Sequence, residues 1–189
     1  AYPDVLDGSV LLKVGDKITT DHIMPAGTYL KLRSNIPNYA QVVFECFNED
    51  GHPTFAERAA AVRDSGRHGV VVAGDSYGQG SSREHAAICP MHLGVRAVIA
   101  RSIERIHSAN LINFGILPLL FAGESDYAKI AADDDIRIEG IREQLRPDAP
   151  VLASVRSPDG QYWECTFRHD LSEADVEVIL SGGRLSMFG

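Results

Sequence analysis

The middle of the chain alternates between short apolar runs and stretches with apolar side chains at helical spacing. Its apolar runs have the length of strands buried on both faces of a sheet; they cover residues 69–73, 94–100 and 116–121. The helical patterns cover residues 55–65, ending near Gly66, and residues 102–113, ending at Gly115. With a further helix after the loop at 74–85, the order strand, loop, helix, strand, helix, strand predicts a parallel α/β unit.

Both ends of the chain show strand-like alternation of apolar and polar positions. Residues 8–18 predict a strand pair around a Gly15-Asp16 turn. The last third predicts three strands and a terminal helix, at 136–139, 151–156, 161–168 and 172–180. Ser172 and Asp175 form a capping pattern for that helix. The acidic run 133–135 is expected to be a solvated turn. Residues 28–40 show no clear pattern. We therefore expect one α/β domain over residues 1–189, with an added β layer.

Composition and charge restrict the possible partners. The 189 residues are 44% hydrophobic and 7% aromatic, the profile of a globular protein with a core of its own. The formal net charge of −8 argues against DNA and makes RNA an unlikely partner, because binding phosphates needs an excess of Lys and Arg. No apolar run approaches the roughly 20 residues that span a bilayer, so a membrane partner is not expected either.

The cysteines and the chain start indicate a reducing compartment and a larger protein. Cys46, Cys89 and Cys165 are widely scattered and odd in number, so no disulfide framework is expected, and the cytoplasm is the expected location. Their spacing also fits no metal or iron–sulfur site, so no metal ligand is expected on this chain. The opening Ala1-Tyr2-Pro3-Asp4 resembles the middle of a sequence, which predicts a domain excised from a longer chain or a processed subunit.

Candidate chemistry concentrates in the Gly- and Ser-rich loop at residues 74–85, which follows an apolar strand and runs into a helix. Backbone N–H groups and the positive end of the helix would meet there, which suits an anion. Arg83 adds a planar guanidinium that can hold a carboxylate by two hydrogen bonds. A Walker A loop would need a Lys and a dinucleotide fingerprint would need Gly where Arg83 stands, so a carboxylate or bare phosphate is favoured.

Two interpretations of Ser81 stay open on composition alone. With Glu84 it forms a Ser-x-x-Glu capping box, and Ser82 could cap the helix instead. Alternatively, Ser81 is a catalytic base, which requires an alkoxide stabilised by nearby positive charge. Arg83 and the helix N-terminus are the available sources of that charge.

Several ordered motifs resemble the aconitase family. The loop motif Gly80-Ser81-Ser82-Arg83-Glu84-His85-Ala86-Ala87 follows Tyr77-Gly78 and is the most specific. Thr19-Thr20-Asp21-His22-Ile23 precedes Pro25-Ala26-Gly27, and Leu30-Lys31-Leu32-Arg33 places Arg33 twelve residues after Asp21. Arg101-Ser102-Ile103, His107, Asn110 and Gly115-Ile116-Leu117-Pro118 also follow the family. The resemblance covers nearly the whole chain and implies the swivelling β/β/α three-layer domain of the aconitase C-terminus, a fold shared with the isopropylmalate isomerase small subunit.

The resemblance also implies a role for each site residue. Ser81 matches the catalytic base and Asp21 an active-site acid with an orienting role. Arg33 and Arg83 match carboxylate clamps, Arg83 also stabilises the serine alkoxide, and Ser82 supports the substrate. The family's 4Fe-4S cluster belongs to other domains of the complete enzyme. Purely structural interpretations stay open: Asp21 in an Asx-type turn, Arg33 as a surface arginine, His85 with a structural role, and Cys89 as a small core residue.

The implied activity is part of an aconitate hydratase, a hydro-lyase that interconverts citrate and isocitrate through cis-aconitate. Arg33 favours a tricarboxylate, because hydrogen bonds to charged groups are worth about 1.5–3 kcal/mol each. The alternatives are a small subunit of an isopropylmalate isomerase or homoaconitase-type enzyme, and a non-catalytic carboxylate-binding module. The expected partners are the tricarboxylate substrate and the cluster-bearing domains or large subunit.

Overall fold

The computed structural model describes residues 1–188, with side chains described through residue 186, and its centre is one sheet of seven strands. The strands follow the order β1-β2-β3-β4-β7-β6-β5, and the sheet closes into a barrel. They are β1 (Leu6–Lys13), β2 (His68–Ala73), β3 (Val95–Ala100), β4 (Leu117–Phe121), β5 (Asp135–Ile138), β6 (Val151–Arg156) and β7 (Tyr162–Arg168).

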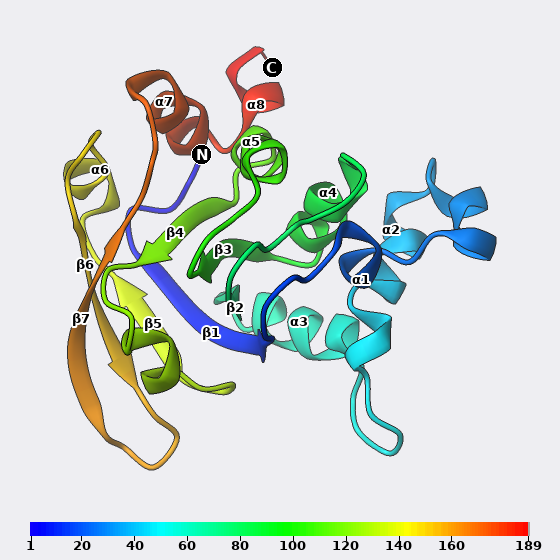
Figure 1. The fold of residues 1–189 in the computed structure, drawn as a ribbon, viewed down its shortest axis with the longest axis horizontal. Coiled ribbons are helices and arrows are strands. Elements are labelled where there is room, and N and C mark those ends of the chain that lie inside the picture. The colour runs from blue at the N-terminus through cyan, green and yellow to red at the C-terminus, as the bar shows by residue number, and fades with distance from the viewer. Residues whose placement is uncertain (189) are drawn as a thin grey trace.

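Strands β1 to β4 are parallel and are joined by helices that pack on one side of them. Figure 1 shows these helices on the opposite side of the parallel strands from β5, β6 and β7. They are α3 (Phe55–Asp64), α4 (His85–His92) and α5 (Arg105–Asn113). The predicted parallel α/β unit is therefore confirmed.

The antiparallel strands β5, β6 and β7 close the sheet, because β5 pairs with β1 and β7 pairs with β4. The alternation of side chains along β2 divides the interior into two cores. Val70 and Val72 belong to a core shared with β5, β6 and β7. Val71 and Ala73 belong to a core shared with α3 and α4. The mixed α/β class is confirmed, and its β layer takes the form of a barrel wall.

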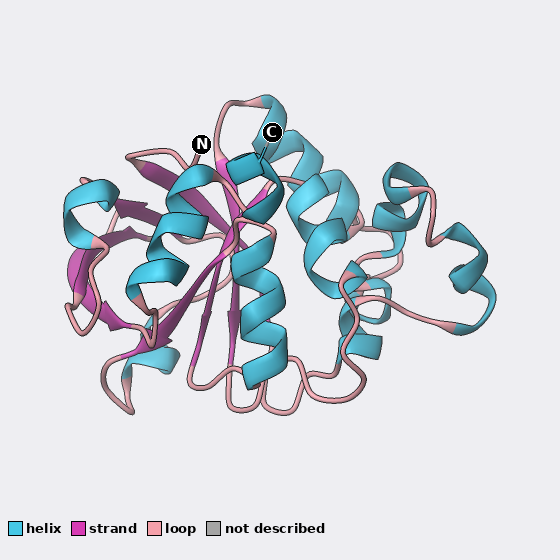
Figure 2. Cartoon of the chain, turned by 90° about the horizontal axis from the view of Figure 1, so that it is seen from above, coloured by secondary structure: helices cyan, strands magenta, loops and turns pink. Residues whose placement is uncertain are grey.

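The remaining helices lie outside the sheet, and Figure 2 shows a group of short helices on the side of the molecule away from the strands. α7 (Glu173–Ser181) has the predicted capping box of Ser172 and Asp175 and stops at Gly182. Its neighbour is α8 (Arg184–Phe188). The segment between β1 and α3 holds the short elements α1 (Thr20–Ile23), η1 (Gly27–Leu32), α2 (Ile36–Tyr39), η2 (Ala40–Val42) and η3 (Glu45–Phe47). η4 (Asp126–Lys129) and α6 (Ile141–Gln144) flank β5. No helix within residues 1–188 is long and apolar enough to cross a membrane.

Two local predictions are wrong. Residues 8–18 are not a hairpin, because Asp16 leaves the sheet to accept a 2.7 Å hydrogen bond from the Asp75 backbone N–H. The acidic run 133–135 is not fully solvated. Asp134 is 3% exposed, and its carboxylate accepts a hydrogen bond from Ala131 N–H. The Asp16 contact joins residues 59 positions apart, whereas the Asp134 contact lies within its own turn, and composition reveals neither.

Candidate functional site

The Gly-rich loop lies at the carboxyl ends of the parallel strands, where open α/β sheets place their ligands. Its first residue, Gly74, packs so closely on Asp16 that a side chain has no room there. Gly78 and Gly80 have φ of 89° and 99°, in the left-handed region that glycine adopts most readily. These positions hold the loop away from a helical path until α4 begins at His85.

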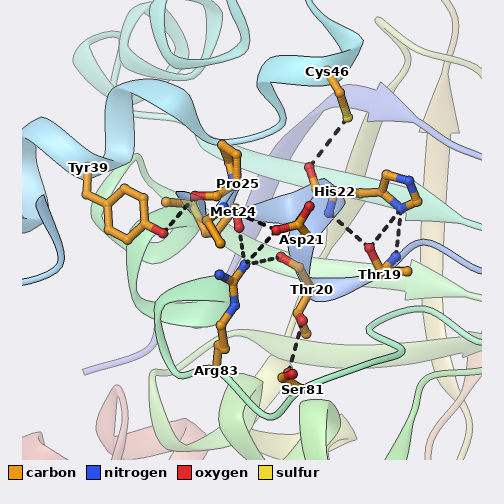
Figure 3. A network of polar contacts seen from close by, with 11 residues as sticks. Thr19, Thr20, Asp21, His22, Met24, Pro25, Tyr39, Cys46, Ser81 and Arg83 are labelled. Carbon is orange, nitrogen blue, oxygen red and sulfur yellow. Dashed lines mark hydrogen bonds and ion pairs between the residues drawn. The ribbon is translucent and has the colours of Figure 1, made fainter. Parts of the chain in front are cut away.

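Ser81 lies at the exposed bend of this loop, and α1 fixes its backbone. The buried hydroxyl of Thr20 donates a 2.9 Å hydrogen bond to the carbonyl of Ser81. Thr20 N–H also donates to Gln79 O at 2.8 Å. The Ser81 hydroxyl itself makes no hydrogen bond to any of residues 1–188, so the backbone is held while the side chain stays available. Figure 3 shows Thr20 reaching Ser81.

The capping interpretation of Ser81 and Ser82 is wrong. α4 starts at His85, its N-cap is Glu84, and no side chain caps it. The N–H groups of residues 82–85 consequently find no hydrogen-bond acceptor among the described residues. Since α4 also directs its positive end to this place, the loop presents several free donors beside Ser81.

Arg83 turns back from the loop toward α1 (Figure 3). Its Nη2 donates to the carbonyls of Thr20, at 2.8 Å, and Met24. The same nitrogen lies 4.0 Å from Asp21 Oδ1, and the Arg83 side chain is 19% exposed. Because a guanidinium carries five N–H donors, these contacts anchor Arg83 and leave other donors for a ligand.

Asp21 is exposed and lies between Arg83 and the turn after α1. Its Oδ1 accepts a 3.1 Å hydrogen bond from Ala26 N–H, five residues ahead, which is longer than the span of an Asx turn. Thr19 and His22 form the capping box of α1 instead. The structure thus brings Asp21 and Arg83 together.

Arg33 is exposed at the end of η1, and α4 holds its backbone. The ring nitrogen Nε2 of His85 lies 2.7 Å from the Arg33 carbonyl oxygen. His85 also packs against the ring of Tyr39, at 5.5 Å between centroids, and Tyr39 OH donates to Pro25 O. His85 therefore ties the segment that carries Arg33 to the first turn of α4.

Ser82 contacts α5, a relationship that the sequence patterns did not indicate. Asn110 Nδ2 donates to Ser82 Oγ at 3.4 Å, and Asn110 is 9% exposed. His107, one turn earlier on the same helix face, is 2% exposed and packs against Gly78. The i, i+3 spacing of His107 and Asn110, which places both residues on one face of the helix, was the available clue.

No three His, Cys, Asp or Glu side chains within residues 1–188 converge in a way that could hold a metal ion. Cys46 is exposed, Cys165 is half-buried, and Cys89 is buried, which raises the pKa of the Cys89 thiol to about 12. Cys89 accordingly behaves as a small core residue. These residues do not fit the ligand set of an iron–sulfur cluster.

Comparison with known proteins defines the class. Residues 12–124 match the family model of the aconitase C-terminal domain, and the chain belongs to this family. It is 36% identical over 197 residues to a probable mitochondrial aconitate hydratase of Caenorhabditis elegans, and 38% identical over 198 residues to one of Dictyostelium discoideum. Each alignment covers 97% of this chain but only 25% and 26% of those proteins, so the chain spans about a quarter of their length.

A solved structure supports the fold. The 3-isopropylmalate dehydratase of Methanocaldococcus jannaschii matches with a TM-score of 0.66 at 23% sequence identity, covering 98% of this chain and 92% of that one. At this identity the likeness extends to the fold alone.

The expected cytoplasmic location is contradicted by the relatives, because the matching aconitate hydratases of worm, slime mould and Saccharomyces cerevisiae are mitochondrial by name. The prediction rested on unpaired cysteines. Unpaired cysteines are typical of reducing compartments in general and do not distinguish the cytoplasm from another such compartment.

Proposed function

We propose that this chain is the part of an aconitate hydratase that removes the substrate proton and binds its carboxylates. The observation that carries the proposal is the arrangement of Ser81, whose backbone is fixed by Thr20 while its hydroxyl is exposed and free of partners within residues 1–188. A base must be positioned and yet unoccupied to meet a substrate C–H bond.

Ser81 acts as an alkoxide that takes the proton from the carbon next to a carboxylate. A serine is a base at neutral pH only where its anion is strongly stabilised. The N–H groups of residues 82–85, the positive end of α4 and the remaining donors of Arg83 supply that stabilisation. The electron pair of the broken C–H bond forms the double bond of the unsaturated intermediate as hydroxide leaves.

The arginines bind the carboxylates of the substrate. Arg83 is anchored on α1 and is 19% exposed, so it offers a fixed donor surface. Arg33 is exposed and lies on a segment that His85 holds. We assign to Arg33 the binding of the carboxylate that distinguishes citrate from a substrate with an apolar arm. Ser82 supports a substrate oxygen, and Asp21 orients Arg83.

The rest of the active site belongs to other parts of the complete protein, including the residues that hold the 4Fe-4S cluster. The cluster supplies Lewis-acid chemistry toward the leaving hydroxyl when bound. In the complete protein this chain would act as the swivelling β/β/α domain that covers the cluster-bearing domains.

A second candidate is the small subunit of an isopropylmalate isomerase, which the shared fold favours. The substrate profile of the complete protein distinguishes the two. Conversion of citrate to isocitrate supports the aconitate hydratase. Conversion of isopropylmalate without citrate turnover supports the second candidate, and turnover of neither overturns both.

A further inference from the structure

A separate cavity of about 290 Å³ adjoins the site. It lies between the loop, at Gly78, Gly80 and Ser82, and the first two turns of α5, at Arg105, His107 and Asn110. Apart from Ser82, none of these residues has a part in the proposed proton transfer.

The first turn of α5 presents unused donors to this cavity. Glu104 is the N-cap, but its side chain makes no capping hydrogen bond. The backbone N–H groups of Arg105, Ile106 and His107 have no acceptor anywhere in the described part of the chain. Three free donors at the positive end of a nine-residue helix, with Arg105 also lining the cavity, favour an anion.

His107 is an independent indication of a ligand. It is 2% exposed, yet neither ring nitrogen has a hydrogen-bond partner within residues 1–188. Burial lowers the pKa of His107 to about 4, so the ring is neutral near pH 7, with one nitrogen as donor and the other as acceptor. The ring is held against Gly78 and lies 5.4 Å from the ring of Tyr77. A buried polar ring without a partner is costly, and an oxygen-bearing ligand in the cavity would satisfy its donor.

Asn110 adds a directed donor on the loop side. Because its amide N–H donates to Ser82 Oγ, the Ser82 oxygen is used as an acceptor and its proton is free to be donated. Glu104 is the opposing feature, because this exposed acidic residue also lines the cavity and its charge repels an anion. Because this carboxylate opposes the donors, the cavity alone should bind an anion with low affinity.

We propose that this cavity is a subsite for one carboxylate group, bound by the N-terminus of α5, Arg105, His107 and the Ser82 hydroxyl. The proposal rests on the proposed function, because the carboxylate would be one arm of the substrate. Glu104 keeps the affinity low for a free monofunctional anion, so that the arm enters only when the remainder of the substrate is bound elsewhere.

Nuclear magnetic resonance titration of the 189-residue chain tests the subsite. Succinate, citrate and sodium chloride are added separately, and the backbone amide resonances of residues 105–107 are followed. Both carboxylates should shift these resonances and chloride should not. Glu104→Gln should tighten succinate binding and Arg105→Gln should weaken it, each by about two- to five-fold, the range for a charge at a helix end.

The controls separate this proposal from the proposed function. Arg137→Gln, on β5 and paired with Glu139, should leave succinate binding unchanged. Ser81→Ala should also leave it unchanged, since Ser81 does not line the cavity. Shifts at residues 105–107 with citrate but not with succinate would overturn the proposal that the subsite takes any carboxylate group. An absence of shifts with both carboxylates, or equal effects of Glu104→Gln and Arg105→Gln, would overturn the subsite whatever the activity of Ser81.

Discussion

The Thr20 hydroxyl donates a 2.9 Å hydrogen bond to the backbone carbonyl of Ser81, joining residues 61 positions apart. Thr20 follows β1 and Ser81 follows β2, and these two strands are parallel neighbours in the sheet. The bond therefore restrains the loop that carries the proposed base relative to the sheet.

Thr20→Val should lower the free energy of unfolding by about 1 kcal/mol, the usual loss for one hydrogen bond. It should also lower kcat of the complete protein roughly tenfold, because small displacements of a catalytic group are costly. Thr20→Ser keeps the hydroxyl and is the matched control. Equal kcat in the valine and serine variants would show that this bond does not position the base.

Ser81→Ala should cut kcat in the complete protein by several powers of ten with little change in KM, because the alkoxide acts mainly in the transition state. Its free energy of unfolding should stay within about 0.5 kcal/mol of the parent, since Ser81 caps no helix. Loss of a cap would instead cost about 1 kcal/mol with kcat preserved. Steady-state kinetics and urea denaturation distinguish these outcomes.

Arg33→Lys should lower activity on citrate more than activity on an isopropylmalate-type substrate. Lysine keeps the charge but loses the planar two-point contact with a carboxylate. Arg33 is exposed, so its folding role is small, and thermal unfolding serves as the control. An unchanged ratio of the two activities would show that Arg33 does not determine which substrate the protein prefers.

His107 predicts a pH dependence of stability. Its pKa is lowered from 6.5 to about 4 by burial, so the unfolded chain binds the proton more tightly. The contribution of neutral His107 to the free energy of unfolding is fully present above about pH 6.5 and is lost as the pH falls toward 4. The total loss is about 3 kcal/mol. Urea denaturation between pH 4 and 7 measures this slope.

His107→Gln should reduce the slope in that range. Burial also lowers the pKa values of His68 and His169, so the part of the slope due to them should remain in the variant. An identical slope in parent and variant would contradict the assignment to His107.

The sequence predicted the strands and helices of the parallel half because both faces of β2, β3 and β4 are buried, which leaves unbroken apolar runs. It did not predict closure of the barrel. That closure needs Leu6 to pair with Ile138 and Phe121 with Phe167, and such register is set by packing between distant segments.

The sequence offered the residues of the candidate site but not their geometry. Motif resemblance singled out Ser81, Arg83, Asp21 and Arg33, yet the contacts of Thr20 with Ser81 and of Asn110 with Ser82 depend on how three segments meet. The capping box of Ser81 failed for a local reason. The N-cap of α4 is Glu84, so the helix begins at His85, three residues later than the Ser-x-x-Glu pattern requires.

The central claim is that this chain supplies the base and the carboxylate contacts but not the group that takes up the leaving hydroxide. Both hydrophobic cores lie within the chain, so the 189 residues should fold alone, as circular dichroism can verify. The most direct measurement is citrate–isocitrate turnover by the isolated chain, by the cluster-bearing remainder and by their mixture. We expect no turnover by either part and measurable turnover by the mixture, whereas turnover by the isolated chain would contradict the account.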